Sequence, residues 1–181
     1  EALGRKEGMA IQYGNLGNLH LTRGELEPAE AMYQKSLAIN EVLGCKEGMA
    51  SNYCNLGSLY RTRGELECAE AMYQKSLAIN EALGRKEGMA IQYGNLGTLR
   101  LIQGELEPSE EMFQKSLAIE EALGRKQGMA DQYGNLGNLH LTRGELEPAE
   151  AMYRKSLAIN EALGRKEGMA NQYGNLGTVY G

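Results

Sequence analysis

A repeated block of 40 residues dominates this sequence. The segment 1–40 recurs almost unchanged as 41–80, 81–120 and 121–160, and a partial fifth copy covers 161–181. A unit that recurs at this spacing cannot bury its apolar side alone and does so against its neighbours, so the period predicts a stacked array. We therefore expect residues 1–181 to form a single array. Because the chain starts and stops within a repeat, we also expect it to be part of a longer protein.

Each copy carries the pattern of two helices. In the first copy, apolar residues recur at spacings of three and four over residues 7 to about 23, which is typical of a helix. Gly24 ends this helix, Pro28 lies in the first turn of a second one, and the second helix can continue to Leu43. Antiparallel pairs of this kind predict an all-α fold, a right-handed α-solenoid of about nine helices. The leucines expected in its core are Leu16, Leu56, Leu96 and Leu136.

The composition argues against several classes of partner. The net charge is −5, the pI is about 5.2, and no cluster of Lys or Arg is present, so nucleic acid is not an expected partner. Neither an apolar run of about 18 residues nor a signal peptide is found, which predicts a cytoplasmic protein with no membrane partner. The three cysteines, Cys45, Cys54 and Cys68, all lie in the second copy at spacings that fit no metal site. We interpret them as free thiols and expect no metal or other cofactor.

Small and aromatic residues recur at spacings similar to the tetratricopeptide repeat signature. In the first copy these are Tyr13-x-x-Leu16-Gly17-x-x-His20 and then Ala29-x-x-x-Tyr33. The usual repeat has about 34 residues and closes its second helix with Pro, whereas Glu41 stands at that place here. Elongated repeats with the run Asn15-Leu16-Gly17-Asn18 resemble those of the Leu-Gly-Asn adaptors of spindle orientation, kinesin light chains and bacterial repeat proteins. The resemblance implies a protein-interaction scaffold that binds an extended or helical peptide in a concave groove lined by the first helix of each repeat.

The differences between copies predict which residues contact the peptide. One variable position reads Ile11, Ser51, Ile91, Asp131 and Asn171, and seven residues later a second reads Asn18, Ser58, Thr98, Asn138 and Thr178. Seven residues are two helical turns, so both positions share one stripe of the first helix. We interpret this stripe as a surface diversified for a ligand, with local charge from Arg61, Arg100 and Asp131. The alternative is that any solvent-facing position drifts.

A constant asparagine lies beside the variable stripe. The residues are Asn15, Asn55, Asn95, Asn135 and Asn175. An amide offers both a donor and an acceptor, so it can pair with the backbone of a peptide of any sequence, and the resemblance implies this role. Alternatively, each Asn bonds a neighbouring helix and stiffens the array.

Glycine within the first helix is a second unusual feature, because it costs about 1 kcal/mol relative to alanine. It occurs at Gly14, Gly94, Gly134 and Gly174. Either adjacent first helices pack closely there, or the missing side chains leave a trough for a ligand backbone.

An enzyme is not expected from these residues. Catalysis needs a nucleophile with a base, paired carboxylates or a metal set, yet the histidines, His20 and His140, occupy equivalent positions of separate copies and are interpreted as partly buried packing residues. The alternative to a peptide scaffold is a structural or self-assembling array, designed or recently amplified, with no dedicated ligand. Exposed repeat ends further predict end-to-end association between copies of the chain.

Overall fold

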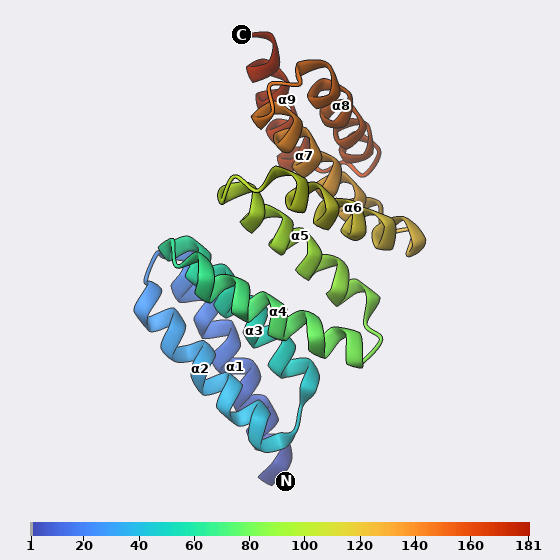
Figure 1. Ribbon diagram of the computed structural model, residues 1–181. Helices are drawn as coiled ribbons and strands as arrows, with labels where there is room; N and C mark the ends of the chain where they lie inside the picture. Colours follow the sequence, from blue (N-terminus) through green and yellow to red (C-terminus); the bar gives the residue numbers. More distant parts are fainter. Residues whose placement is uncertain (1) are drawn as a thin grey trace. The chain divides into compact units, whose positions relative to one another are not determined.

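The structure, a computed structural model, describes residues 2–181, with side chains from residue 4 onward. This part of the chain is helical throughout, apart from short turns (Figure 1). In chain order its helices are α1 (Ala2–Thr22), α2 (Leu26–Leu43), α3 (Lys46–Arg63), α4 (Leu66–Ala82), α5 (Lys86–Ile102), α6 (Leu106–Ala122), α7 (Lys126–Thr142), α8 (Leu146–Ala162) and α9 (Lys166–Tyr180). The expected all-α fold, with two helices per copy, is confirmed. We call the odd-numbered helices A and the even-numbered helices B.

The chain divides into two compact units. The first extends to Gly88 and the second begins at Met89. In the first unit α1 packs against α2, α2 against α3 and α3 against α4. In the second unit α6 packs against α7, α7 against α8 and α8 against α9. Within each unit, successive helices therefore stack in chain order (Figure 1).

Glycine ends the helices in a left-handed conformation. At Gly24 and Gly44 the backbone φ is +75° and +66°, a region that side-chain-bearing residues rarely adopt. Around Gly24 the turn is closed by two backbone bonds, from the Glu25 N–H to the His20 carbonyl at 2.9 Å and from the Gly24 N–H to the Leu21 carbonyl at 2.9 Å. This pair of bonds is the Schellman arrangement, which satisfies carbonyls that the helix end leaves open. The glycine stop signals read from the sequence are thus confirmed.

An aromatic ring on each helix B fills the space beside a glycine on its own helix A. Tyr33 is fully buried, and a Cβ added to Gly17 would lie 2.5 Å from its ring. The same clash would occur between Gly137 and Tyr153, at 2.4 Å. Any larger residue would push the two helices apart, so the small residue at Gly17 allows their close approach.

A buried serine also ties helix B to helix A. The Ser36 hydroxyl donates to the backbone carbonyl of Ala10 at 2.7 Å, and Ser156 donates to Ala130 at the same distance. Each bond satisfies a buried polar group and fixes the axial register between the two helices.

Successive repeats are joined by apolar and ionic contacts. Leu56 and Leu59 of α3 pack against Tyr33 of the preceding repeat. Beside them, Glu30 accepts from the Tyr60 hydroxyl at 2.8 Å and pairs with Arg63 at 2.5 Å. Burial raises the pKa of the Glu30 carboxyl, but the bonds from Tyr60 and Arg63 outweigh that effect, so its pKa is lowered from the ordinary value. Burial, together with the same carboxylate, raises the pKa of Tyr60 to about 12.

The expected core position of Leu16 is wrong. Leu56, Leu96 and Leu136 are 3%, 6% and 6% exposed, as predicted, but Leu16 is 43% exposed. Leu56 and Leu136 each lie against the ring of the preceding helix B. No helix of the described chain covers the corresponding side of α1, so Leu16 remains open to solvent.

Candidate functional site

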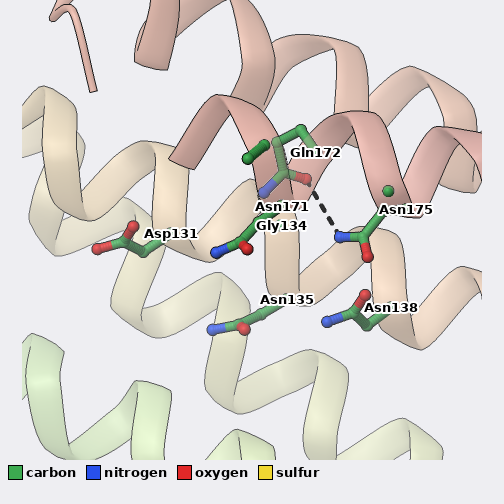
Figure 2. Close-up of a pocket in the computed structure, with 9 residues that line it drawn as sticks. Asp131, Gly134, Asn135, Asn138, Asn171, Gln172 and Asn175 are labelled. Carbon is green, nitrogen blue, oxygen red and sulfur yellow. Dashed lines mark hydrogen bonds between the residues drawn. The ribbon is translucent and has the colours of Figure 1, made fainter. Parts of the chain in front are cut away.

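Within the described part of each unit, clefts lie between successive A helices. In the first unit a cleft of about 550 Å³ lies between α1 and α3. In the second unit a cleft of about 310 Å³ lies between α5 and α7, and another of about 570 Å³ between α7 and α9. Figure 2 shows the last of these, with Asp131 and Asn135 on α7 and with Asn171 and Asn175 on α9. Each cleft is thus built from equivalent positions of successive A helices.

Most of the residues predicted to bind peptide line these clefts. The first cleft contains Ile11, Asn15, Asn18, Ser51 and Asn55. The second contains Ile91, Asn95, Thr98, Asp131 and Asn135. The third contains Asp131, Asn135, Asn138 and Asn175. Neither Ser58 nor Arg61 lines any of the three, and Arg61 instead lies beside the buried Tyr73 hydroxyl.

The first variable position is exposed in every copy. Ile11 and Ile91 are 65% and 43% exposed although they are apolar, and Ser51 is also exposed. In the fourth copy Asp131 accepts a hydrogen bond from Arg165 of the following repeat at 3.1 Å. A change at this position alters the cleft without disturbing the core.

The second variable position has a structural role that the sequence did not reveal. The buried Tyr33 hydroxyl donates to Asn18 Oδ1 at 2.7 Å, and the Tyr153 hydroxyl donates to Asn138 Oδ1 at 2.8 Å. Burial raises the pKa of both tyrosines, because it disfavours the phenolate. Where the helix B of the same copy has a tyrosine, the residue at this position must offer an acceptor to it, so the position is not diversified for a ligand alone.

The constant asparagines face the clefts, and two of them are also bonded within their own helices. Asn135 Nδ2 donates to Gln132 Oε1 at 3.3 Å, and Asn175 Nδ2 donates to Gln172 Oε1 at 3.4 Å, the bond drawn in Figure 2. Their side chains are only half-buried. The bonds described run along one helix rather than to a neighbouring helix, so they leave the asparagines at the cleft surface.

Buried amides next to the variable stripe were missed by the sequence reasoning. Gln132 and Gln172 are 7% and 8% exposed and line the two clefts of the second unit. Each lies over a helix-interior glycine of the preceding A helix: a Cβ added to Gly94 would be 3.1 Å from Gln132 Nε2, and one added to Gly134 would be 3.3 Å from Gln172 Nε2. Of the two explanations for the helix-interior glycines, close packing of adjacent A helices applies to Gly94 and Gly134. In both cases the contacting group is the amide side chain of the following A helix. The near-constant amide one residue after a variable position was the available signal.

A buried carboxylate was also missed. The last buried position of helix B is Asn40, Asn80 or Asn160 in three copies but Glu120 in the third. Glu120 is 3% exposed and lines the cleft between α5 and α7, where Arg125 Nη1 lies 3.4 Å from its Oε1. The single Asn-to-Glu difference between copies was the signal for it.

The histidines are partly buried, but hydrogen bonding describes them better than packing. His20 Nδ1 lies 2.5 Å from Glu25, and His140 Nδ1 lies 2.6 Å from Glu145, each in the turn that follows. Tyr60, at the equivalent position, instead reaches Glu30 of the preceding repeat. Among the described residues, no group of three or more His, Cys, Asp or Glu could hold a metal ion. Over the same residues, no helix is both long and apolar enough to cross a bilayer.

The repeat of the sequence and the stacked helix pairs match one known family. The profile described as Tetratricopeptide repeat matches residues 8–82, 48–122 and 88–162. The chain belongs to the tetratricopeptide repeat family. Successive matches are offset by one 40-residue copy, so the tetratricopeptide signature is present in each full copy. No curated protein sequence matches.

Solved structures share this fold. BtubC (BKLC) from P. vanneervenii superimposes with a TM-score of 0.84 at 25% identity, over 97% of this chain and 73% of that one. The nearly identical TPR-like repeats of a putative kinesin light chain from Podosopora anserina give a TM-score of 0.74 at 16% identity, over 97% of this chain and 86% of that one. Aspartyl phosphate phosphatase F from Bacillus subtilis gives 0.86 at 14% identity, over 93% of this chain but only 44% of its own length. These likenesses establish the tetratricopeptide architecture.

Proposed function

We propose that this tetratricopeptide chain is a scaffold that binds an extended or helical peptide segment along its A helices. The observation that carries the proposal is a constant, half-exposed asparagine beside an exposed, variable residue in each cleft. Asn135 and Asp131 form such a pair in the second unit, and Asn55 and Ser51 form one in the first. The asparagines hold the peptide backbone and the variable residues select its side chains.

The lining of the clefts suits a peptide better than a small apolar ligand. Residues with amide, hydroxyl or carboxylate groups outnumber the apolar residues, and apolar side chains such as Ile11 and Ile91 are interspersed singly. Each amide-to-backbone bond contributes about 0.5–1.5 kcal/mol net, so several are needed for useful affinity. A repeated asparagine provides that number.

Several broader assignments accompany this proposal. We infer that residues 1–181 act as one array, because α5 crosses the boundary between the two units without a break. The partner is a protein or peptide rather than nucleic acid, since the clefts contain no concentration of basic residues. A cytoplasmic location and the absence of catalysis complete the proposal.

Selection from a displayed peptide library tests the function. The chain of residues 1–181 is immobilised, bound peptides are resynthesised, and their affinities are measured by calorimetry. Replacing Asn55, Asn95 and Asn135 together with Ala should abolish binding, because backbone contacts are lost in both units.

The matched control replaces Gln34, Gln74 and Gln114, which are exposed on the B helices and line none of the clefts, with Ala. This variant should bind like the unmodified chain. Unchanged affinity in the triple Asn variant, with an unchanged melting temperature, would refute the proposed binding mode. A melting temperature lowered only in the Asn variant would instead assign those residues to stability.

Copies of the chain also associate through their end faces in this proposal. Leu16 and Leu19 of α1 are 43% and 45% exposed, whereas Leu59, equivalent to Leu19, is fully buried.

A further inference from the structure

The cleft between α5 and α7 has a carboxylate on its wall. Glu120 comes from the last turn of α6, and its side chain is 4% exposed, yet it lines the cleft together with Asp131 and Gln132 of α7. A Cβ added to Gly128 would lie 2.2 Å from the Glu120 carboxyl carbon. A glycine at that place is therefore required for the carboxylate to fit.

The other copies show that structure alone does not require a carboxylate here. Asn80 Nδ2 donates to the Ser76 carbonyl at 2.9 Å, and Asn160 Nδ2 makes the same bond to Ser156 at 2.9 Å. A carboxylate cannot donate this bond at neutral pH. The third copy thus exchanges a bond within helix B for a charge beside the cleft.

The charges around Glu120 have changed together. At the start of α7, Gln127 stands where Glu7, Glu47, Glu87 and Glu167 stand in the other copies. Gln127 is exposed at the edge of the same cleft, so the carboxylate has been removed from an exposed site and placed at a buried one. A buried charge attracts an opposite charge more strongly than an exposed one does, because water screens it less.

The ionisable groups that line this cleft are Glu120, Asp131 and Arg125, which leaves one net negative charge. The Arg125 guanidinium lies 3.4 Å from one carboxylate oxygen of Glu120, and its side chain is 35% exposed. Asp131 is 52% exposed and pairs with Arg165 at 3.1 Å. Arg125 therefore balances Glu120 from the solvent side, while the carboxylate lies against the cleft.

We propose that the cleft between α5 and α7 is a subsite for a basic side chain, lysine or arginine, of the bound peptide, held by a charge-assisted hydrogen bond to Glu120. This inference rests on the proposed peptide-binding function and adds to it the chemistry of one ligand residue and its place along the array. Asn95 and Asn135 flank the subsite and hold the peptide backbone, and Asp131 adds negative charge at its rim. The cleft of the first unit has Asn40 at the position of Glu120, so it selects no basic residue in this way.

The experiment compares library selections on the unmodified chain and on Glu120→Asn. This substitution introduces the residue found at the equivalent position of the other three complete copies, so the fold is retained. Glu111→Gln is the matched control, since it removes one charge from the exposed side of the same helix, where Glu111 pairs with Lys115. Chelator is present throughout, so a divalent cation cannot act as the ligand of the carboxylates.

Peptides selected on the unmodified chain should share a lysine or arginine at one position, and those selected on Glu120→Asn should not. Replacing that residue by its uncharged counterpart, citrulline for arginine or acetyl-lysine for lysine, should weaken binding to the unmodified chain about tenfold or more. The same replacement should matter less than about threefold for Glu120→Asn. Conversely, Asn40→Glu should add a second basic preference, contributed by the first unit.

The possible failures are distinguishable. Peptides that bind and need Asn95 and Asn135 but show no basic preference would overturn the subsite and leave the proposed function intact. A basic preference that persists in Glu120→Asn, or that disappears equally in Glu111→Gln, would overturn the assignment to Glu120. If the unmodified chain selects no peptide at all, the proposed function fails and the subsite fails with it.

Discussion

At the residue scale, the third copy shows how one core side chain constrains a residue at the surface. Where the other complete copies have a buried tyrosine, the third has Phe113, which offers no hydroxyl. The acceptor position beside it is Thr98, whose hydroxyl donates instead to the Gly94 carbonyl of its own helix at 3.0 Å. Thr98 therefore has no tyrosine hydroxyl to accept from in this copy. A buried hydroxyl without an acceptor costs about 1–3 kcal/mol, so each buried tyrosine needs an acceptor at this position.

This coupling gives a prediction for the fourth copy. Asn138→Ala removes the acceptor of the buried Tyr153 hydroxyl and should lower the free energy of unfolding by about 1–3 kcal/mol. In the background of Tyr153→Phe, the same Asn138 substitution should cost much less, because no hydroxyl then needs a partner. Chemical denaturation of the two single variants and the double variant measures the coupling. Additive costs would show that the Tyr153–Asn138 bond does not stabilise the fold.

At the scale of the helices, the same kind of aromatic contact occurs on two sides of a helix A. The ring of the same copy's helix B packs beside Gly57 on α3 and beside Gly137 on α7. The leucines of α3 and α7 pack on the ring of the preceding helix B. Helices α3 and α7 are therefore each enclosed between two aromatic residues. A repeat shortened by a few residues would move these two contacts out of register.

The buried leucines of the A helices should contribute most to stability. Leu96 is 6% exposed, and Leu96→Ala should lower the free energy of unfolding by about 2–5 kcal/mol, because it removes buried methyl groups and leaves a cavity. Gln114→Ala, on the exposed side of α6, should change stability by less than about 0.5 kcal/mol. Thermal or urea unfolding compares the two variants. Similar losses for both would show that the helix faces are assigned incorrectly.

At the scale of the whole molecule, two helices have faces that no described helix covers. On α1, Leu16 and Leu19 are nearly half exposed. On α9, a Cβ added to Gly177 would meet no atom within 4 Å, and Ala170 is exposed although Ala130, its equivalent, is fully buried. The uncovered faces of α1 and α9 both belong to A helices. A contact between them would lack the packing of a helix B that joins successive A helices inside each unit. Such a contact should be weaker than an internal one and should dissociate on dilution.

End-to-end association is tested by sedimentation over a wide concentration range. The unmodified chain should show a sedimentation coefficient that increases with concentration, because head-to-tail contacts do not close on themselves. Leu16→Glu combined with Leu19→Glu should remain monomeric, since two carboxylates would be placed in the contact. Val42→Glu, which alters a 74% exposed apolar residue on α2, is the control and should associate normally. A strictly monomeric unmodified chain at the highest concentration would contradict the proposal.

The helices and turns of this protein could be predicted from its sequence alone. Apolar spacing indicated two helices per copy, and Gly24 and Gly44 indicated where they end, because backbone conformation there depends on residues a few positions away. The tandem period further predicted the stacking, since identical units must pack in identical ways. Most of the residues predicted to contact the peptide line the clefts for the same reason.

Other properties were decided only by the tertiary structure, because they depend on neighbours from a different helix. Leu16 and Leu56 have the same local sequence pattern, yet one is exposed and the other buried, since only Leu56 has a preceding helix B to pack against. Asn18 looked like a free surface position until the hydroxyl of Tyr33 was found 2.7 Å away. Glu120 looked like one substitution among many, and only the fold brings its carboxylate to the cleft wall beside α7. Local sequence determines backbone conformation, but burial and hydrogen-bond partners are determined by packing between repeats.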